Sequence, residues 1–446
     1  MPIRNRPPLL VTLTTATASA ALLAAASPAL AEPQVHDPER NVYVPAEDEL
    51  TRTLKVAVLY NEDEVQIRYE YERENPSWYH DVYVYEDGAW VRYDTGFVGP
   101  APNGLYEDRI SIMIDDGSVD YFGSQGGFVT AHEGMRSLGS AVEGEALEDA
   151  LGESNVRKYI PQSREDGPFE ASWDRPRGDD EIRQLREDGV FLDLIQWRAH
   201  RSNPMGVADN GYVLEYRHGS EGESMFTTNF DSEAGHPEYM FDPDQTGMRA
   251  LDWETLLERG YGQDDLYYLA EEHATAFDPE HEWEEGDTIP RRLLREPSGS
   301  RGAVTADGRH EDGAWHVRMT RTLDAPNPLD SKSLEDGGLY TVSFAVHEAA
   351  GARWHYVSLP LKLGLENEDG DIVARQVEGP LDEAEAQWHE VDLLYPDQIT
   401  WQWLTDEDRH PAADAVRDDR SVYEFHDFDD LYDRIVETEL QKLGKD

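Results

Sequence analysis

Two stretches of strand-forming residues lie on either side of a short polar turn near the start of the chain, and the second of them alternates apolar and polar residues with a period of two. Residues 54–60 form the first stretch, residues 61–64 the turn and residues 65–71 the second stretch. Because successive side chains of a strand point to opposite faces, this pattern predicts a β-hairpin with one buried face. Further stretches of strand character follow at residues 82–85, 90–93, 109–114, 191–200, 212–217, 315–322, 339–346 and 354–364.

Many short strands separated by turns indicate a mainly β chain. We expect an immunoglobulin-like or carbohydrate-binding-module-like β-sandwich with long loop insertions and a few short helices. Short helices are predicted near residues 145–151 and 253–259, and an amphipathic one at the C-terminus with Leu431, Ile435 and Leu440 on its apolar side. The expected division is a signal peptide (1–31), a polar leader (32–50), one β-sandwich domain (51–420) with insertions at about 140–190 and 220–310, and a C-terminal helix (421–446).

The first 31 residues have the composition of a secretory signal peptide. Arg4 and Arg6 precede an uncharged stretch rich in Ala, Leu and Thr, and Ala29-Leu30-Ala31 places small residues where a signal peptidase requires them. We expect cleavage after Ala31 and a periplasmic or secreted product that does not insert into a membrane. A membrane anchor is the alternative, for which the stretch is weakly hydrophobic.

The net charge of the chain restricts the classes of partner that it can bind. It carries 93 Asp and Glu against 39 Lys and Arg, a formal charge of -54, and the acidic residues are spread over its whole length. Aromatic residues make up 10%, which indicates a folded chain and not an acidic disordered one. The charge excludes nucleic acid and anionic membranes as partners, and its even spread is typical of a halophile's protein. An acidic cation-storage protein would show calcium loops that the sequence lacks.

The chain contains no cysteine. This excludes disulfides, thiolate nucleophiles, cysteine-bound zinc, iron–sulfur clusters and covalently attached haem. Any metal must therefore be bound by His, Met, Lys or carboxylate side chains. Motifs of serine hydrolases, zinc proteases and phosphate-binding loops are absent from the sequence as well.

Two candidate metal ligands lie in a glycine-rich segment. His132 and Met135 are three residues apart within residues 125–136, and both imidazole and thioether groups bind haem iron. The alternative is a hydrogen-bonding surface histidine beside a methionine of the core.

Other segments place aromatic rings beside cations. Trp197 precedes Arg198 and Arg201, a combination that suits the rim and the propionates of a planar anionic ligand. Internal ion pairs with nearby acids are the alternative. Three later strands carry Trp, His and Arg residues at their ends, among them Trp315, Arg353 and His355. These residues could form the floor of a pocket. The alternative is that they belong to the ordinary core of a sandwich.

In this order the segments resemble the ethylbenzene-dehydrogenase-related haem-binding domain family. That family includes the γ (cytochrome b) subunits of exported molybdenum dehydrogenases of the DMSO-reductase type and stand-alone periplasmic cytochromes. The resemblance runs from about residue 56 to about residue 365. It rests on the opening hairpin, Glu107-Asp108-Arg109 before a strand, and residues 126–135, 195–199, 315–323, 344–347 and 355–358.

The resemblance implies a β-sandwich that binds one haem b noncovalently, with a Met and a Lys as axial ligands. The Met position corresponds to Met135, and the Lys position falls near His355, which implies a Met/His iron. Some relatives carry cysteines where this chain has Phe128 and Ala131, while His132 remains as a competing ligand. The implied function is electron transfer to a redox partner protein, in this family a molybdenum oxidoreductase.

We therefore expect an exported, halophilic, b-type cytochrome-like electron carrier or accessory subunit without substrate chemistry of its own, and not an enzyme. Two alternatives stay open: a haem-free β-sandwich that binds a sugar or a protein partner, and a periplasmic enzyme with perturbed carboxylates in a cleft. Convergence of Met135 with His355, or with His132, on one pocket would favour the haem hypothesis. The residues expected to contact the haem ring and propionates are Trp197, Arg198, Arg201, Trp315 and Arg353.

Overall fold

A computed structural model describes residues 32–93, 98–100, 105–396, 398–420 and 437–438, and from Pro33 onward these belong to one compact unit. The predicted signal peptide (1–31) lies outside the described residues. So does the predicted C-terminal helix, except for residues 437–438, which are helical. Within the described part of the chain, no helix is both long and apolar enough to cross a membrane.

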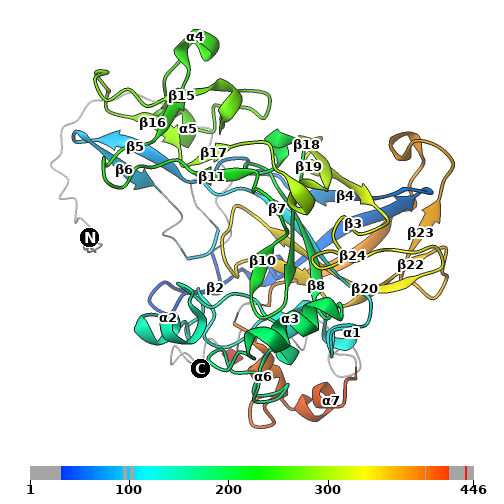
Figure 1. Cartoon of the computed structure of the whole chain (residues 1–446). Coiled ribbons are helices and arrows are strands. Elements are labelled where there is room, and N and C mark those ends of the chain that lie inside the picture. The colour runs from blue at the N-terminus through cyan, green and yellow to red at the C-terminus, as the bar shows by residue number, and fades with distance from the viewer. Residues whose placement is uncertain (1–31, 94–97, 101–104, 397, 421–436, 439–446) are drawn as a thin grey trace. The chain divides into compact units, whose positions relative to one another are not determined.

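Thirteen strands form one large sheet (Figure 1). Their order is β10-β9-β8-β7-β20-β21-β24-β3-β4-β19-β18, and β22 and β23 form a second connection between β20 and β3. The strands are β3 (Thr51–Tyr60), β4 (Glu64–Glu72), β7 (Arg109–Asp115), β8 (Leu192–Arg198), β9 (Asp209–Val213), β10 (Arg217–Gly219), β18 (Thr305–Glu311), β19 (Ala314–Thr322), β20 (Leu339–His347), β21 (Tyr356–Ser358), β22 (Leu361–Leu365), β23 (Ile372–Gln376) and β24 (His389–Leu394).

The sheet folds over on itself into two layers. Trp197 on β8 meets Trp315 on β19 with ring centroids 4.9 Å apart, although the two strands are far apart in the strand order. At the far edges, the backbone N–H of Ala208, just before β9, donates to the carbonyl of Val304, just before β18, at 3.0 Å. The predicted mainly β, sandwich-like fold is therefore confirmed.

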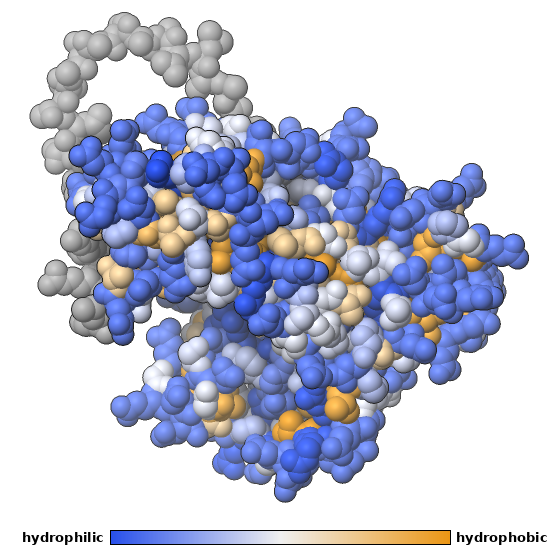
Figure 2. All heavy atoms as spheres, turned by 45° about the horizontal axis from the view of Figure 1, so that its top comes forward, coloured by the Kyte–Doolittle hydropathy of each residue, from blue (hydrophilic) through white to orange (hydrophobic). Residues whose placement is uncertain are grey.

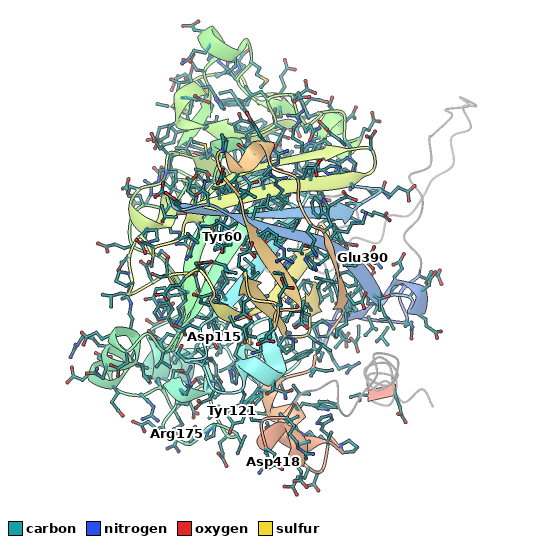
Figure 3. All side chains as sticks on the ribbon, turned by 90° about the vertical axis from the view of Figure 1, so that its right-hand side faces the viewer. Tyr60, Asp115, Tyr121, Arg175, Glu390 and Asp418 are labelled. Carbon is teal, nitrogen blue, oxygen red and sulfur yellow. The ribbon has the colours of Figure 1, made fainter. Side chains whose placement is uncertain are left out.

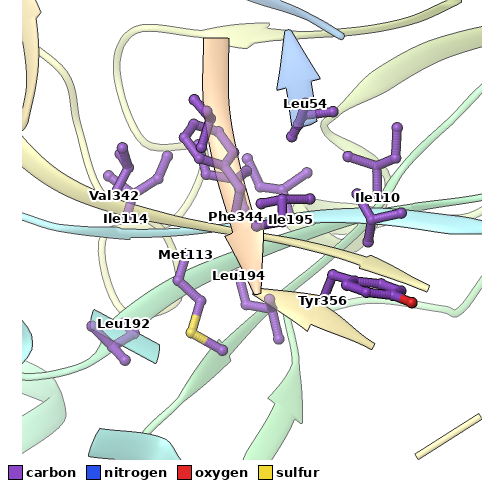
Figure 4. Packing of buried hydrophobic residues seen from close by; sticks show 14 of the residues in the cluster. Leu54, Ile110, Met113, Ile114, Leu192, Leu194, Ile195, Val342, Phe344 and Tyr356 are labelled. Carbon is purple, nitrogen blue, oxygen red and sulfur yellow. The ribbon is translucent and has the colours of Figure 1, made fainter. Parts of the chain in front are cut away.

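The two faces of β7 and β8 have different roles. Figure 4 shows Ile110 and Ile114 on one side of β7 and Met113 on the other, as the period of two requires. On β8, Ile195 likewise points into the core between the layers, whereas Leu194 points away from it. Every residue of both strands is buried, because a second group of elements covers their outer face.

The outer face is covered by residues 122–158, here called the cover segment. Gly127 donates its N–H to the Ser343 hydroxyl of β20 at 3.4 Å, and Gly126 approaches Pro360 so closely that an added Cβ would lie 3.1 Å from the proline nitrogen. The helices of this part of the chain are α1 (Phe122–Gln125), the 3₁₀ helix η2 (Gly126–Thr130), α2 (Glu145–Leu151) and, further along, α3 (Asp179–Glu187). Helix α2 lies where the sequence predicted it.

The end of the described chain returns to the cover segment. The N–H of Trp401 donates to the carbonyl of Ala131 at 2.6 Å, and Figure 3 shows Tyr121 and Asp418 at the same end of the molecule. The elements concerned are α6 (Trp401–Thr405) and α7 (Ala413–Arg417). Near the start of the chain, β1 (Val35–Asp37) and β2 (Val42–Val44) form a separate small ribbon.

Residues 220–310 are more ordered than the sequence indicated. Much of this insertion builds a second hydrophobic cluster together with the hairpin at residues 82–93, which belongs to this lobe and not to the large sheet. Its apolar residues are widely spaced, so periodicity did not reveal its short strands. The elements are β5 (Val82–Glu86), β6 (Ala89–Tyr93), β11 (Phe226–Thr228), β12 (Tyr239–Phe241), α4 (Pro243–Thr246), β13 (Leu251–Asp252), α5 (Trp253–Leu257), β14 (Leu269–Ala270), β15 (Ala274–Ala276), β16 (Asp287–Pro290) and β17 (Arg292–Leu294).

Candidate functional site

A narrow slot lies between the outer face of the large sheet and the cover segment. Its floor is formed by residues of neighbouring strands, among them the small residues Ser111 of β7 and Ser343 and Ala345 of β20. The cover segment contributes Gly127 and Phe128. The cavity measures about 100 Å³ and its surface is more apolar than polar.

Met135 and His355 line this same slot from different parts of the chain. Met135 lies in the cover segment, where its backbone pairs with Val156 and its Sδ accepts a hydrogen bond from the His132 N–H at 3.1 Å. His355 lies just before β21, and its Nδ1 is 2.5 Å from the carbonyl oxygen of Arg353. The sequence therefore identified two residues that converge on one cavity.

The His355 imidazole is suited to binding a metal. Its Nε2 makes no hydrogen bond within the described residues. Burial, reinforced by the charges of Lys158 and Arg353, holds its pKa well below 6.5, so that the ring is neutral and keeps a lone pair.

His132 is not available to the slot. Its ring stacks on Tyr159 with centroids 3.7 Å apart, its Nε2 lies 2.9 Å from the Tyr159 carbonyl oxygen, and its Nδ1 lies 3.1 Å from Nε2 of Gln402. Both ring nitrogens are engaged, and burial lowers its pKa to about 3. His132 is a structural residue in this geometry, which removes it from the expected ligand set.

Two further residues with ligand chemistry line the slot, and the sequence did not single them out as ligands. His347 of β20 stacks against His355, and its Nδ1 is buried without a partner in the described structure. Lys158 donates to the Thr130 hydroxyl at 3.1 Å, and burial lowers its pKa to about 7. A buried lysine of this kind is neutral for part of the time near neutral pH and can then bind a metal.

The slot adjoins a larger pocket of about 600 Å³, here called the arginine pocket. The two cavities share Arg109, Arg136, Arg157, Leu194, Arg217 and Ala352 in their walls. Ten of the chain's 39 Lys and Arg residues line the arginine pocket, against two aspartates. Its arginines are Arg92, Arg109, Arg136, Arg157, Arg198, Arg201, Arg217, Arg291, Arg292 and Arg301.

The predicted cations Arg198 and Arg201 lie in this pocket, each with a carboxylate partner. Arg198 pairs with Asp209 at 2.5 Å, and Arg201 pairs with the fully buried Glu107. The alternative of internal ion pairs is therefore correct for both residues, although both also face the cavity. Arg353 lines the slot itself and donates to the Ile399 carbonyl at 3.0 Å.

Trp197 and Trp315 do not reach either cavity and pack against each other in the core. The expectation that they contact a planar ligand is not supported by their position. The physical reason is the period of two, because a strand that points Arg198 into the pocket must point its neighbour Trp197 to the opposite face. The strand of Trp315 lies in the other layer and does not contribute to the slot.

Aromatic rings hold the arginines of the pocket in place. The guanidinium groups of Arg198, Arg201 and Arg292 lie 5.6, 5.3 and 5.2 Å from the centre of the Phe226 ring. Tyr106 contacts two of the cations, and although its burial acts in the opposite direction, Arg201 and Arg109 lower its pKa. The pocket thus has a strongly positive potential inside an acidic protein.

The residues present fit a haem in their chemistry. A thioether and a neutral imidazole on one apolar slot are an axial pair known for haem iron, and the arginines at its mouth suit propionates. The volume of the slot is smaller than the roughly 300–1,000 Å³ that is usual for ligand pockets. A bound haem therefore requires the cover segment to move outward or the ligand to extend into the arginine pocket. Among the described residues, no group of three or more His, Asp or Glu side chains offers a separate metal site.

A match to a known protein family establishes the family of this chain. A family profile described as ethylbenzene dehydrogenase matches residues 24–358. The chain belongs to this family. No curated protein matches the chain. The ethylbenzene dehydrogenase family relates the protein to molybdenum enzymes, and the resemblance inferred from the sequence is confirmed at the level of the family.

Membership of the ethylbenzene dehydrogenase family corrects one expectation. The sequence led us to expect an electron carrier or accessory subunit and not an enzyme. The family is named for an enzyme and its profile covers most of the chain, so this expectation conflicts with the family assignment. The expectation of a protein that is not an enzyme is therefore wrong at the level of the family.

Proposed function

We propose that the slot binds one haem b noncovalently and that the protein transfers electrons through it within an ethylbenzene-dehydrogenase-type oxidoreductase. The observation that carries the proposal is the convergence of Met135 and His355 on one apolar slot with an arginine-lined mouth. The two residues come from segments that are far apart in the sequence.

The side chains have separate roles in this proposal. Met135 and His355 would hold the iron, and a bound haem would supply a one-electron couple, whose potential an axial Met tends to raise. The apolar floor around Ala345 excludes water, which also affects the potential. Arg353 in the slot would face the propionates.

The second part of the proposal concerns the location of the protein, the salt concentration at which it works and its redox partner. The signal-peptide composition of residues 1–31 supports export to the periplasm or the medium. The charge of -54, spread evenly, supports function at high salt, where screening weakens repulsion between surface carboxylates. Figure 2 shows a mostly hydrophilic face with only scattered hydrophobic residues. The family supports a molybdenum-containing oxidoreductase as the redox partner.

Titration of the purified protein with haemin in concentrated KCl tests the proposal. We expect stoichiometric uptake and, after dithionite reduction, a sharp α-band with a pyridine haemochrome of haem b. Met135→Leu should change this spectrum. Met113→Leu is the matched control, since Met113 lines the same slot from the sheet floor and is not assigned to the iron. A folded protein that takes up no haemin would overturn the proposal and favour a haem-free binding module.

A further inference from the structure

The arginine pocket holds more positive charge than its own acids balance. Among the described residues, five of its ten arginines form the ion pairs given next, with three carboxylates as their partners. Asp81 pairs with Arg92 and Arg291, at 3.3 and 2.7 Å. Asp209 pairs with Arg198 and Arg301, at 2.5 and 2.7 Å, and Glu107 pairs with Arg201.

The other five arginines make no ion pair with a carboxylate in the described part of the chain. The hydrogen bonds that these arginines make go to uncharged acceptors: Arg217 donates to the side chain of Gln196 at 3.1 Å and Arg292 donates to the Thr228 hydroxyl at 2.7 Å. A haem has two propionates, so it would leave most of this charge uncompensated. The five residues are Arg109, Arg136, Arg157, Arg217 and Arg292.

A buried imidazole in the wall of the pocket also lacks a partner. His80 is 2% exposed, and neither of its ring nitrogens makes a hydrogen bond within the described residues. It lines the arginine pocket and not the slot. A buried polar group without a hydrogen bond destabilises the folded state, so the position of His80 favours a ligand that accepts a hydrogen bond.

The electrostatics of the cations agree with this interpretation. Burial, together with the charges of Arg201 and Arg291, lowers the pKa of Arg292 to about 10. Burial and Arg198 hold the pKa of Arg217 well below its ordinary value. Both guanidinium groups are therefore in surroundings that an additional negative charge would stabilise.

We propose that the arginine pocket binds a small multivalent oxyanion, with Arg217, Arg292 and His80 as direct contacts. Its volume of about 600 Å³ lies within the range of small-molecule sites, roughly 300–1,000 Å³. The planar fork of a guanidinium matches the paired oxygens of phosphate and carboxylate groups, which is the shared chemistry of the ligand. The site goes beyond haem binding, because Arg292 and His80 do not line the slot.

Isothermal titration of the purified protein with pyrophosphate and, separately, with citrate tests this proposal at constant ionic strength in KCl. The two probes distinguish a phosphate ligand from a carboxylate ligand. We expect saturable binding of at least one probe, weakened about tenfold or more by Arg292→Gln and by Arg217→Gln, since each removes a charge-assisted hydrogen bond. The matched control is Arg309→Gln, an exposed arginine of β18 that pairs with Asp264 at 2.8 Å outside the pocket.

Absence of binding in the wild type, or equal affinity in the wild type and both pocket variants, would overturn the proposal. Binding that disappears once the protein is loaded with haem would also overturn it, because the pocket would then serve only the propionates. If Arg292→Gln fails to fold, Arg292→Lys takes its place in the test. Lysine keeps the positive charge but lacks the paired N–H groups of the guanidinium, so we expect an affinity between those of the wild type and of a variant without the charge. A protein that takes up no haem but binds pyrophosphate would refute the haem proposal and leave this one standing.

Discussion

The imidazole rings of His347 and His355 stack with their centroids 4.4 Å apart and their planes 4° from parallel. His347 lies at the end of β20, and the stack fixes the plane of the His355 ring. The Nδ1 atom of His355 faces the carbonyl oxygen of Arg353, so its Nε2 is the nitrogen left for a ligand. His347 thus supports the candidate ligand without being required to bind the iron itself.

The two histidines should therefore respond differently to substitution. We expect His355→Gln to lower haemin affinity by at least about tenfold and to change the reduced spectrum, because an axial ligand is lost. His347→Phe retains an aromatic ring in the stack, and we expect the spectrum to keep its form. Haemin titrations of both variants provide the measurement. The reverse order of effects would assign the iron to His347.

A close approach between strands predicts a steric effect at Gly308. A Cβ added to this residue of β18 would collide with the indole of Trp197, which is held by a hydrogen bond to Asn203 at 2.8 Å. We expect Gly308→Ala to reduce the free energy of unfolding by about 1–3 kcal/mol, the usual cost of overpacking. Urea denaturation measures this change. Gly123→Ala, in the exposed part of α1, has room for the added methyl group and should be neutral or slightly stabilising.

Buried neutral histidines predict a loss of stability in mild acid. Burial lowers the pKa of His200 to about 4, whereas the unfolded chain titrates near 6.5. As the pH falls, the unfolded state binds the proton first, so the stability is full above about pH 6.5 and is lost progressively toward about pH 4. We expect His200→Asn to flatten this dependence by on the order of 2 kcal/mol between about pH 7.5 and pH 5.

The His200→Asn variant keeps a side-chain donor for the carbonyl of Trp78, which lies 3.0 Å from the ring nitrogen of His200. Denaturation midpoints at the two pH values provide the comparison. The same substitution at His316, an exposed residue of β19, serves as the control and should leave the pH dependence unchanged. Parallel curves for His200→Asn and the wild type would show that this imidazole does not contribute to the acid sensitivity.

Local patterns in the sequence were sufficient for the main strands and for two helices. The apolar stretch at residues 54–60, the polar turn and the alternation of residues 65–71 predicted the hairpin of β3 and β4, because these patterns depend only on neighbouring residues. Strands at residues 82–85 and 90–93 were predicted as well, but not the place of their hairpin in a second lobe. Which sheet a hairpin joins depends on long-range packing that no local pattern records.

The candidate site could be predicted only in part for the same reason. The motif order of the family pointed to Met135 and His355, whereas the arginine pocket combines residues from Arg92 to Arg301 that form no local motif. One available signal was overlooked. Residues 109–114 include apolar side chains on both faces of the strand, and this predicts that a second layer covers the sheet where the slot lies.

The ion pair between Arg321 and Asp193 joins the two layers of the sheet. Arg321 on β19 reaches Asp193 on β8 at 2.7 Å, and both side chains are almost completely buried. Arg321→Met would leave a buried carboxylate without its cation, and among the described residues the backbone N–H of Lys332 would be its remaining donor, at 2.9 Å. We expect a loss of about 3–5 kcal/mol in the free energy of unfolding, measured by urea denaturation.

Arg318→Met, on the same strand, removes an exposed pair with Asp382 at 3.7 Å and should cost less than about 1 kcal/mol. Equal effects of the two substitutions would show that the buried pair does not stabilise the contact between the layers.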